Sequence, residues 1–304
     1  MIQWYPGHMH KAGKEFKKIL AQVDLVIEVL DARLPFSSQN PMLARLRKEK
    51  PVLKILNKSD LADPERLQRW RDLFEADAAV KTLCTSLQDR AHVEIPALCR
   101  QLVPKRPNRS ENIYALIAGI PNVGKSTLIN RMAGRIIAKT GNEAAVTRMQ
   151  QRIEVSPELT LIDTPGMLWP NIENRNSGYR LAVSGAIRDT ALDMQDVAAF
   201  LAEFLIGQYP KSVRLRYGLE SLPAGDMELL EAIARKRGCI VSGGRVDFEK
   251  VSRLIISECR NGELGPLCFE TPEQIEREMA ELEIIREQKA QRKAARKGLK
   301  QRRP

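Results

Sequence analysis

One segment, Gly119-Ile-Pro-Asn-Val-Gly-Lys-Ser126, limits what this chain can fold into more than any other stretch of the sequence. It matches the pattern G-x-x-x-x-G-K-[S/T] and lies between an apolar run at 113–118 and a helical pattern that begins near Lys125. Glycines allow successive backbone N–H groups to turn toward phosphate oxygens, and a helix N-terminus adds partial positive charge. An unrelated glycine turn is the alternative, but the flanking strand and helix favour a phosphate-binding loop, called the P-loop below.

Two side chains of the P-loop have chemistry suited to a nucleotide and its metal ion. We expect Lys125 to reach the β- and γ-phosphates, and we expect the hydroxyl of Ser126 to ligate Mg²⁺. Downstream, Asp163-Thr-Pro-Gly166 ends an apolar run; after a P-loop, such an aspartate holds the magnesium shell and the N–H of Gly166 meets the γ-phosphate. The expected nucleotide contacts of the P-loop and the residue after it are Pro121, Asn122, Val123, Gly124, Lys125, Ser126 and Thr127.

Short apolar runs alternate with helical patterns over the first half of the chain. This alternation predicts βαβ units, and hence an α/β fold with a mostly parallel sheet and helices on both faces. After about Trp169 the patterns are helical, which predicts a second, all-α domain. We expect an α/β domain at 1–172, a helical domain at 173–285 and a basic tail at 286–304. The expected strands are 24–30, 51–56, 79–84, 113–118, 152–156 and 159–163, and the expected helices lie near 40–49, 64–75, 92–102, 125 onward, 178–187, 196–208, 226–237, 247–260 and 272–297.

The tetrapeptide Asn57-Lys-Ser-Asp60 follows the expected strand at 51–56. Guanine presents two N–H donors that a fixed carboxylate can accept together, whereas adenine presents the opposite polarity at N1. Asn-Lys-x-Asp at a strand end supplies that carboxylate in GTPases, so Asn57, Lys58 and Asp60 are expected to bind the base. Thr85-Ser86 ends the next expected strand, where GTPases place a short loop that backs the guanine.

The two motifs occur in the reverse of the usual GTPase order, with the base-reading motif before the P-loop. A circularly permuted chain can form the same sheet, because the termini of compact domains are often close together. The strand ends would still converge on one crevice at the carboxyl edge of the sheet. The polar, proline-bearing linker near 104–112 would then bridge the two ends of the unpermuted domain.

On these motifs the sequence resembles the circularly permuted GTPases, and most closely the ribosome biogenesis GTPase A (YlqF) family. The resemblance covers roughly residues 1–270. It implies a circularly permuted P-loop GTPase domain, GTP hydrolysis coupled to late assembly of the large ribosomal subunit, and rRNA contacts from the helical domain. The matching stretches are Trp4-Tyr-Pro-Gly-His-Met9, Asp31-Ala-Arg-Leu-Pro35, Asn57-Lys-Ser-Asp60, the P-loop, Asp163-Thr-Pro-Gly-Met-Leu-Trp-Pro170, and Lys236-Arg-Gly-Cys239 with Ser242-Gly-Gly244.

The resemblance also implies catalytic residues, with one departure from many GTPases. Thr147 is the candidate switch I threonine, a Mg²⁺ ligand, although the family more often shows Pro-Gly-Val-Thr-Thr where this chain has Ala-Ala-Val-Thr-Arg148. Met167 occupies the position of the usual water-orienting glutamine, and a thioether cannot polarise water. GTPases of this kind use K⁺ held partly by a P-loop asparagine, here Asn122, and His8 is a second candidate to orient water. A structural histidine and a loop-stabilising asparagine are the alternatives.

The positive charge of the chain is concentrated at its C-terminal end. The net charge is +11, and residues 286–304 hold nine basic residues against one acidic residue, a net +8. A basic segment of this kind is typical of a polyanion-binding element, although a solvated, frayed tail is the alternative. An anionic membrane is disfavoured, because the tail lacks the aromatic and leucine face of an interfacial helix. The charge therefore favours a polyanion partner over a membrane, and the resemblance implies that rRNA and the large ribosomal subunit precursor are the partners.

The remaining composition points to a cytoplasmic protein. No apolar run approaches the roughly 20 residues of a membrane helix, and the N-terminal segment has no apolar core of a secretory signal. Five cysteines without a C-x-x-C spacing indicate reduced thiols rather than a disulfide framework or a zinc site.

Three functions compete at this stage. The first is a GTPase assembly factor that uses GTP/GDP, Mg²⁺ and K⁺. The second is a nucleotide-gated RNA-binding protein whose hydrolysis is incidental, which the missing glutamine supports. The third is a P-loop kinase or ATPase, against which Asp60 argues.

Overall fold

The computed structural model describes residues 17–103, 112–137, 151–164 and 172–301, and for residues 293–301 it describes the backbone alone. Six strands form one sheet in the order β3-β2-β1-β4-β6-β5, and all neighbours pair in parallel except β5 and β6. This mostly parallel sheet confirms the predicted α/β fold, and each strand lies within one or two residues of its predicted position. The strands are β1 (Leu25–Asp31), β2 (Val52–Asn57), β3 (Val80–Thr85), β4 (Ile113–Gly119), β5 (Gln151–Ser156) and β6 (Leu159–Asp163).

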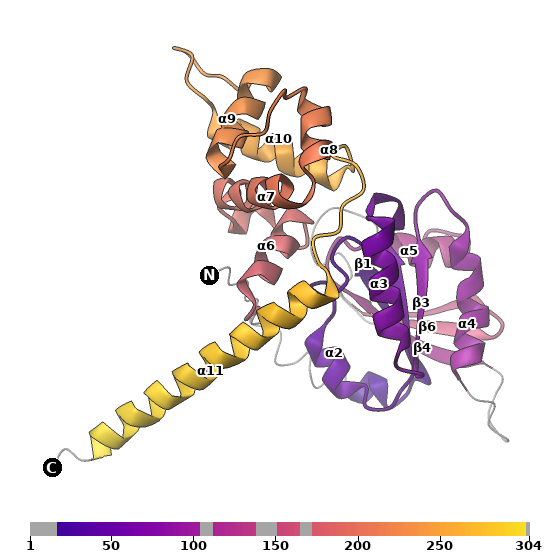
Figure 1. Ribbon diagram of the computed structural model, residues 1–304. Helices are drawn as coiled ribbons and strands as arrows, with labels where there is room; N and C mark the ends of the chain where they lie inside the picture. Colours follow the sequence, from indigo (N-terminus) through magenta and orange to yellow (C-terminus); the bar gives the residue numbers. More distant parts are fainter. Residues whose placement is uncertain (1–16, 104–111, 138–150, 165–171, 302–304) are drawn as a thin grey trace.

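The central strand β1 is buried over its whole length because helices cover both faces of the sheet (Figure 1). Its side chains alternate between two clusters: Ile27 belongs to a cluster with Ile95 and Leu128, and Val26 to another with Leu43. Consecutive side chains of a strand point to opposite faces, so an unbroken apolar run requires cover on both sides. The covering helices are α2 (Pro41–Leu46), α3 (Pro64–Glu75), α4 (Ile95–Leu102) and α5 (Lys125–Ala133), with short 3₁₀ turns η1 (Ser59–Leu61) and η2 (Ala91–Glu94).

A second, helical part of the chain follows the sheet, as predicted. Its packing centres on α7, which contacts four other helices of this part, and its core joins the larger core cluster of the sheet. One helix of this part, α8, is absent from the sequence prediction. The elements are α6 (Arg175–Val183), η3 (Asp189–Ala191), α7 (Met194–Gln208), α8 (Pro210–Tyr217), α9 (Asp226–Arg237) and α10 (Phe248–Arg260).

The last helix, α11 (Pro272–Gln301), runs away from the rest of the molecule as a long rod (Figure 1). The described contacts of α11 lie in its N-terminal half: Glu278 is paired with the buried Arg180 of α6, Ile275 is buried beside Trp70 of α3, and Arg286 is paired with Glu173. The helix crosses residue 286 without a break, so the predicted boundary of the basic tail lies inside one helix. Within the described ranges, no helix is both long and apolar enough to cross a membrane.

The two parts of the chain are joined by a strap between α10 and α11. Its backbone N–H groups bond to the sheet-bearing part, from Leu267 to the carbonyl of Leu61 at 2.9 Å and from Phe269 to that of Arg33 at 2.8 Å. Glu270, fully buried at the end of the strap, accepts hydrogen bonds from the backbone N–H groups of Phe36 and Ser37. Burial raises the pKa of Glu270 although Arg180 opposes this. These contacts hold the helical part at one edge of the sheet.

Candidate nucleotide-binding site

The carboxyl ends of three neighbouring strands lie level at the edge of the sheet. Asp31 at the end of β1 is in register with Asn57 at the end of β2, and Asn57 is in register with Thr85 at the end of β3. On the other side of β1, β4 ends at Gly119, where the P-loop begins. Open α/β sheets bind ligands at this edge. The predicted base-reading motif and the predicted P-loop therefore meet in one place.

Asn57 connects the two motifs directly. Its Nδ2 donates to the backbone carbonyl of Val123 at 2.7 Å, and its Oδ1 accepts from Oγ1 of the buried Thr85 at 3.0 Å. Gly124 lies against the same amide with φ of +94°, and a Cβ at this position would lie 2.3 Å from Nδ2 of Asn57. Only glycine fits this approach, because both the backbone angle and the space exclude a side chain.

Lys58 forms the second bridge. Its Nζ donates to the backbone carbonyl of Asn122 at 2.9 Å and to Oδ2 of Asp31 at 2.9 Å. Lys58 and Asn122 both have positive φ, of 60° and 58°. Such angles are uncommon outside glycine and occur often at functional sites. The motif and the P-loop thus meet through two residues in unusual conformations.

The fully buried Asp31 carboxylate also binds Arg33, whose Nε and Nη2 donate to its two oxygens at 2.9 Å each. Burial alone would raise the pKa of Asp31, but Arg33 and Lys58 together hold it below its ordinary value of 3.8. Burial likewise opposes the charge of Arg33, and the Asp31 carboxylate raises the pKa of this guanidinium. Nη1 of Arg33 donates to the carbonyl of Cys259 at 3.2 Å, at the C-terminal end of α10. This arginine therefore links the site to the helical part.

Lys125 and Asp163 form a buried ion pair at the start of α5, with a short contact between Nζ and Oδ1. Burial lowers the pKa of Lys125, and Asp163 opposes this shift. The second oxygen of Asp163, Oδ2, is buried without a hydrogen-bond partner among the described residues. An unsatisfied buried carboxylate oxygen is costly, and hard divalent cations prefer such ligands. The chemistry of this position therefore fits the Mg²⁺ expected there.

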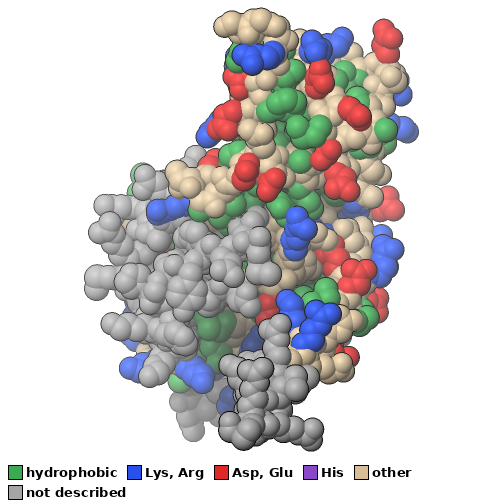
Figure 2. All heavy atoms as spheres, turned by 90° about the vertical axis from the view of Figure 1, so that its left-hand side faces the viewer, with side chains coloured by type: hydrophobic (Ala, Val, Ile, Leu, Met, Phe, Trp, Pro, Cys, Tyr) green, Lys and Arg blue, Asp and Glu red, His purple; other side chains and the backbone are tan. Residues whose placement is uncertain are grey.

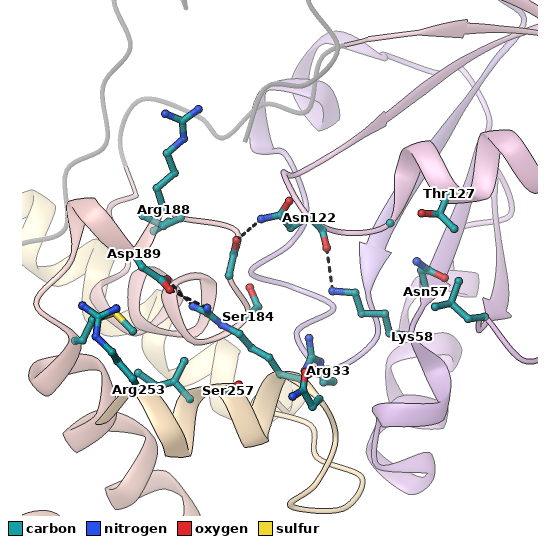
Figure 3. A pocket seen from close by; sticks show the side chains of 18 of the residues that line it. Arg33, Asn57, Lys58, Asn122, Thr127, Ser184, Arg188, Asp189, Arg253 and Ser257 are labelled. Atoms are coloured by element: carbon teal, nitrogen blue, oxygen red, sulfur yellow. Dashed lines mark hydrogen bonds and ion pairs between the residues drawn. The ribbon is translucent and has the colours of Figure 1, made fainter. Parts of the chain in front are cut away.

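A cavity of about 920 Å³ opens between the P-loop and the helical part. Figure 3 shows that its side chains come from both parts of the chain: Asn57, Lys58, Asn122 and Thr127 lie on one wall, and Ser184, Arg188 and Asp189 lie on the other with Arg253 and Ser257 of α10. Nδ2 of Asn122 donates to the carbonyl of Gly185 at 2.8 Å across this space. Asp189, also on that wall, is paired with Arg260. The helical part is therefore a wall of the candidate site.

The remaining predicted residues have different places. Asp60 lies exposed in η1, at the same edge of the sheet as the P-loop, and close enough to Arg33 to raise the pKa of that guanidinium. Ser86 is buried, Pro121 and Val123 are buried in the P-loop, and Ser126 is half-buried in the first turn of α5. Asp60, Ser86 and Lys125 are not part of the described lining of the cavity. His8, Thr147 and Gly166 lie outside the described residues.

A scan against protein-family models matches residues 114–214 to the 50S ribosome-binding GTPase family. The match begins in β4 and includes the P-loop, and it leaves the Asn57-Lys-Ser-Asp60 motif outside, on the N-terminal side. This is the arrangement expected of a permuted chain.

Curated relatives cover nearly the whole sequence. A ribosome biogenesis GTPase A of Bacillus cereus is 43% identical over 294 residues, which cover 94% of this chain and 99% of that protein. The chain belongs to the ribosome biogenesis GTPase A family. A family member of Thermotoga maritima is 32% identical over 274 residues, covering 90% of this chain and 96% of the relative. The chain is therefore a circularly permuted GTPase, and GTP and GDP are its nucleotides.

Solved structures of the family agree in fold. A GDP-bound structure of TM YlqF superposes with a TM-score of 0.63 at 27% identity, covering 85% of this chain and 99% of that one. The GNP-bound structure of YlqF from T. maritima gives 0.61 at 27% identity, covering 86% and 99%. The sheet and the helical domain of this chain are thus shared with the solved members of the family.

Sequence reasoning missed the roles of Asp31 and Arg33. Both belong to a stretch that carries the family resemblance, Asp31-Ala-Arg-Leu-Pro35. Nothing in so short a stretch shows that its two charges are buried and paired. An aspartate at the end of an apolar strand was the available signal. Arg131, near the end of α5, was also missed, because no sequence pattern marks the two backbone carbonyls that it binds.

We predict that Asp31→Asn lowers the free energy of unfolding by about 3–5 kcal/mol at neutral pH, because Arg33 is left buried without its counter-charge. The pKa of Asp31 is lower in the folded chain than its ordinary 3.8, so its stabilisation is complete well above pH 4 and is lost as pH falls. Urea unfolding from pH 7 to pH 3 should show the difference between variant and wild type narrowing below about pH 4.

The surface aspartate Asp77, which pairs with Arg47, offers the control. Asp77→Asn should change stability little at any pH in this range. A difference for Asp31→Asn that stays constant from pH 7 to pH 3 would contradict the assignment of the buried charge to Asp31.

Proposed function

We propose that this chain is a GTP-hydrolysing assembly factor for the large ribosomal subunit, which binds GTP or GDP and rRNA in the cytoplasm. One observation carries the guanine part: Asn57 and Lys58 bond directly to the P-loop carbonyls of Val123 and Asn122, so one nucleotide can contact both motifs. The names of its relatives support the ribosomal part.

In this proposal the P-loop and Lys125 bind the phosphates, and the Asp60 carboxylate accepts the two guanine N–H groups. Nζ of Lys125 is already at the head of α5 and exchanges its partner Asp163 for phosphate oxygens when the nucleotide enters. The buried ammonium interacts strongly with phosphate, because little water surrounds it to screen the two charges. Thr85 and Ser86 back the base.

Mg²⁺ would be held by Ser126, Asp163 and Thr147, and when bound it would neutralise charge on the β- and γ-phosphates. Asp163 supports this assignment with its unpaired buried oxygen Oδ2. The N–H of Gly166 would meet the γ-phosphate. The family resemblance, rather than geometry, carries the roles of Thr147 and Gly166.

Catalysis has to proceed without a glutamine after the Asp163-Thr-Pro-Gly166 motif, because Met167 stands there. We assign K⁺ binding to Asn122, whose carbonyl and amide are already fixed by Lys58 and Gly185. His8 is the proposed water-orienting residue. These roles make Lys125, Thr147, Gly166, His8 and Asn122 the catalytic set.

The helical domain, proposed as residues 173–285, is coupled to the nucleotide by two contacts. Asn122 bonds to Gly185 after α6, and Arg33 bonds to the end of α10. A nucleotide that moves the P-loop therefore acts on the helical domain directly, and one that moves Lys58 acts on it through Asp31 and Arg33. We propose that GTP and GDP set different orientations of this domain against rRNA.

The basic tail, proposed as residues 286–304, supplies a charge-based contact with the phosphate backbone. Figure 2 shows acidic and basic side chains interspersed over the helical domain on the face it presents, whereas the tail holds nine basic residues against one acidic residue. Such a segment neutralises phosphates and reads no bases.

We predict that Asp60→Asn weakens GTP binding about 10- to 100-fold and improves binding of xanthosine triphosphate. An amide presents a donor where the carboxylate presents an acceptor, and xanthine has a carbonyl where guanine has an amine. Competition titrations against labelled GDP measure both. Asp72→Asn, an exposed aspartate on α3, should leave both affinities unchanged, and an unaltered preference in Asp60→Asn would contradict the base contact.

We predict that K⁺ raises the GTP turnover of the wild type several-fold over Na⁺, and that Asn122→Ala brings the ratio close to one. The reason is that the proposed cation ligand is removed. Phosphate release at equal ionic strength measures the ratio. Asn261→Ala, which changes another amide of the same cavity, should keep it, and equal rates of the wild type in both salts would exclude the K⁺ assignment.

We predict that the chain co-sediments with large-subunit precursor particles more strongly with a non-hydrolysable GTP analogue than with GDP, and that the particles stimulate phosphate release. Truncation after Ile285 should weaken binding and flatten its salt dependence, because phosphate contacts release counterions, while basal turnover stays unchanged. Equal binding in both nucleotide states would contradict the coupling. Binding that depends on the nucleotide without stimulated release would favour an RNA-binding protein with incidental hydrolysis.

A further inference from the structure

Arg131 lies two residues before the end of α5, the helix that begins in the P-loop, and its side chain extends from this helix to the turn after β3. Its guanidinium forms short hydrogen bonds with two backbone carbonyls, those of Ser86 and Asp89. These residues belong to the turn that follows β3, 42 to 45 positions earlier in the chain. Arg131 also lines the cavity between the P-loop and the helical domain.

The turn at 86–89 is well ordered by its own hydrogen bonds. Oδ2 of Asp89 accepts from the N–H of Ser86 at 2.7 Å, and Oγ of Ser86 accepts from the N–H groups of Gln88 and Asp89 at 3.2 Å each. These bonds use the N–H groups and leave the carbonyls of Ser86 and Asp89 to be bound from outside. Arg131 binds both carbonyls, so it fixes the turn as a unit relative to α5.

Helix α5 joins the two ends of the proposed nucleotide site. Lys125 stands at its first position and Arg131 six residues later, about 9 Å along the helix axis. The covalent path from Ser86 to the P-loop is indirect and passes through η2, α4 and β4. In addition to the Asn57 and Lys58 contacts, Arg131 therefore sets the distance between the phosphate end and the turn at 86–89.

We infer that Arg131 is a positioning residue for base recognition: it spans the carbonyls of Ser86 and Asp89 and so holds the turn that backs the guanine against the helix that begins at the P-loop. This inference rests on the proposed guanine site. Arginine suits the task because the N–H groups of its planar guanidinium are spread over separate nitrogens and reach acceptors that lie apart, whereas the N–H groups of a lysine ammonium all start from one nitrogen. Helix α5 packs beside η2, where burial and then the charge of Arg131 lower the pKa of His92.

The test compares GTP, ATP and inorganic tripolyphosphate as competitors against labelled GDP, using the full chain. Arg131→Met should weaken GTP about tenfold, a change expected for lost charged hydrogen bonds, and should leave tripolyphosphate within about twofold. Arg131→Lys should also lose affinity for GTP, because lysine keeps the positive charge but cannot bind the carbonyls of Ser86 and Asp89 together. Arg135→Met, at an exposed position just after α5, is the matched control and should behave as the wild type.

Equal weakening of GTP and tripolyphosphate, or full rescue by Arg131→Lys, would overturn the inference, because the arginine would then act on the P-loop or through charge alone. Amide hydrogen exchange of the nucleotide-free protein gives a second measurement. Arg131→Met should speed exchange of Ser86 and Asp89 while the amides of α5 stay protected; unchanged exchange in this turn would also overturn it. A wild type that does not prefer GTP over ATP would instead refute the proposed guanine site itself. The hydrogen-exchange result would still show whether Arg131 fixes the turn at 86–89.

Discussion

The buried carboxylate of Asp31 is the contact on which the rest of the site depends. It stands at the end of the central strand and holds two cations, Arg33 and Lys58. Lys58 reaches the P-loop through the carbonyl of Asn122, and Arg33 reaches the end of α10. A charge buried this deeply is tolerated only when its partners are fixed, so the base-reading motif, the P-loop and the helical domain are held by one electrostatic centre.

Permutation changes which covalent links support the nucleotide site, and non-covalent contacts take over their function. The P-loop and the base-reading motif are far apart in the chain, yet β1 lies between the strands that carry them. Hydrogen bonds from Asn57, Lys58 and Arg131 then join the loops at the edge of the sheet. On the other wall, the loop that follows α6 and the helix α10 line the cavity. A site built in this way has the helical part of the chain as one of its walls.

Much of the site was predictable because its chemistry is local. The P-loop, the aspartate at the end of β6 and the Asn57-Lys-Ser-Asp60 motif each combine a short pattern with a strand end, and the structure brings them to one edge. The contacts of Asn122 with Gly185, of Arg33 with Cys259 and of Arg131 with Ser86 were not predictable. Each joins residues tens or hundreds of positions apart, and all three end on a backbone carbonyl, which has no sequence signature.

The amino-acid sequence by itself determined the α/β class, the places of all six strands, the order of the motifs and the concentration of charge at the C-terminal end. Periodicity and short-range turn chemistry are properties of neighbouring residues, so they can be read along the chain. Only the tertiary structure decided that α8 forms, that the helical part is a wall of the cavity, and that Asp31 is buried between two cations. Those outcomes depend on which distant groups exclude water from one another, and burial of that kind is a property of the packed molecule.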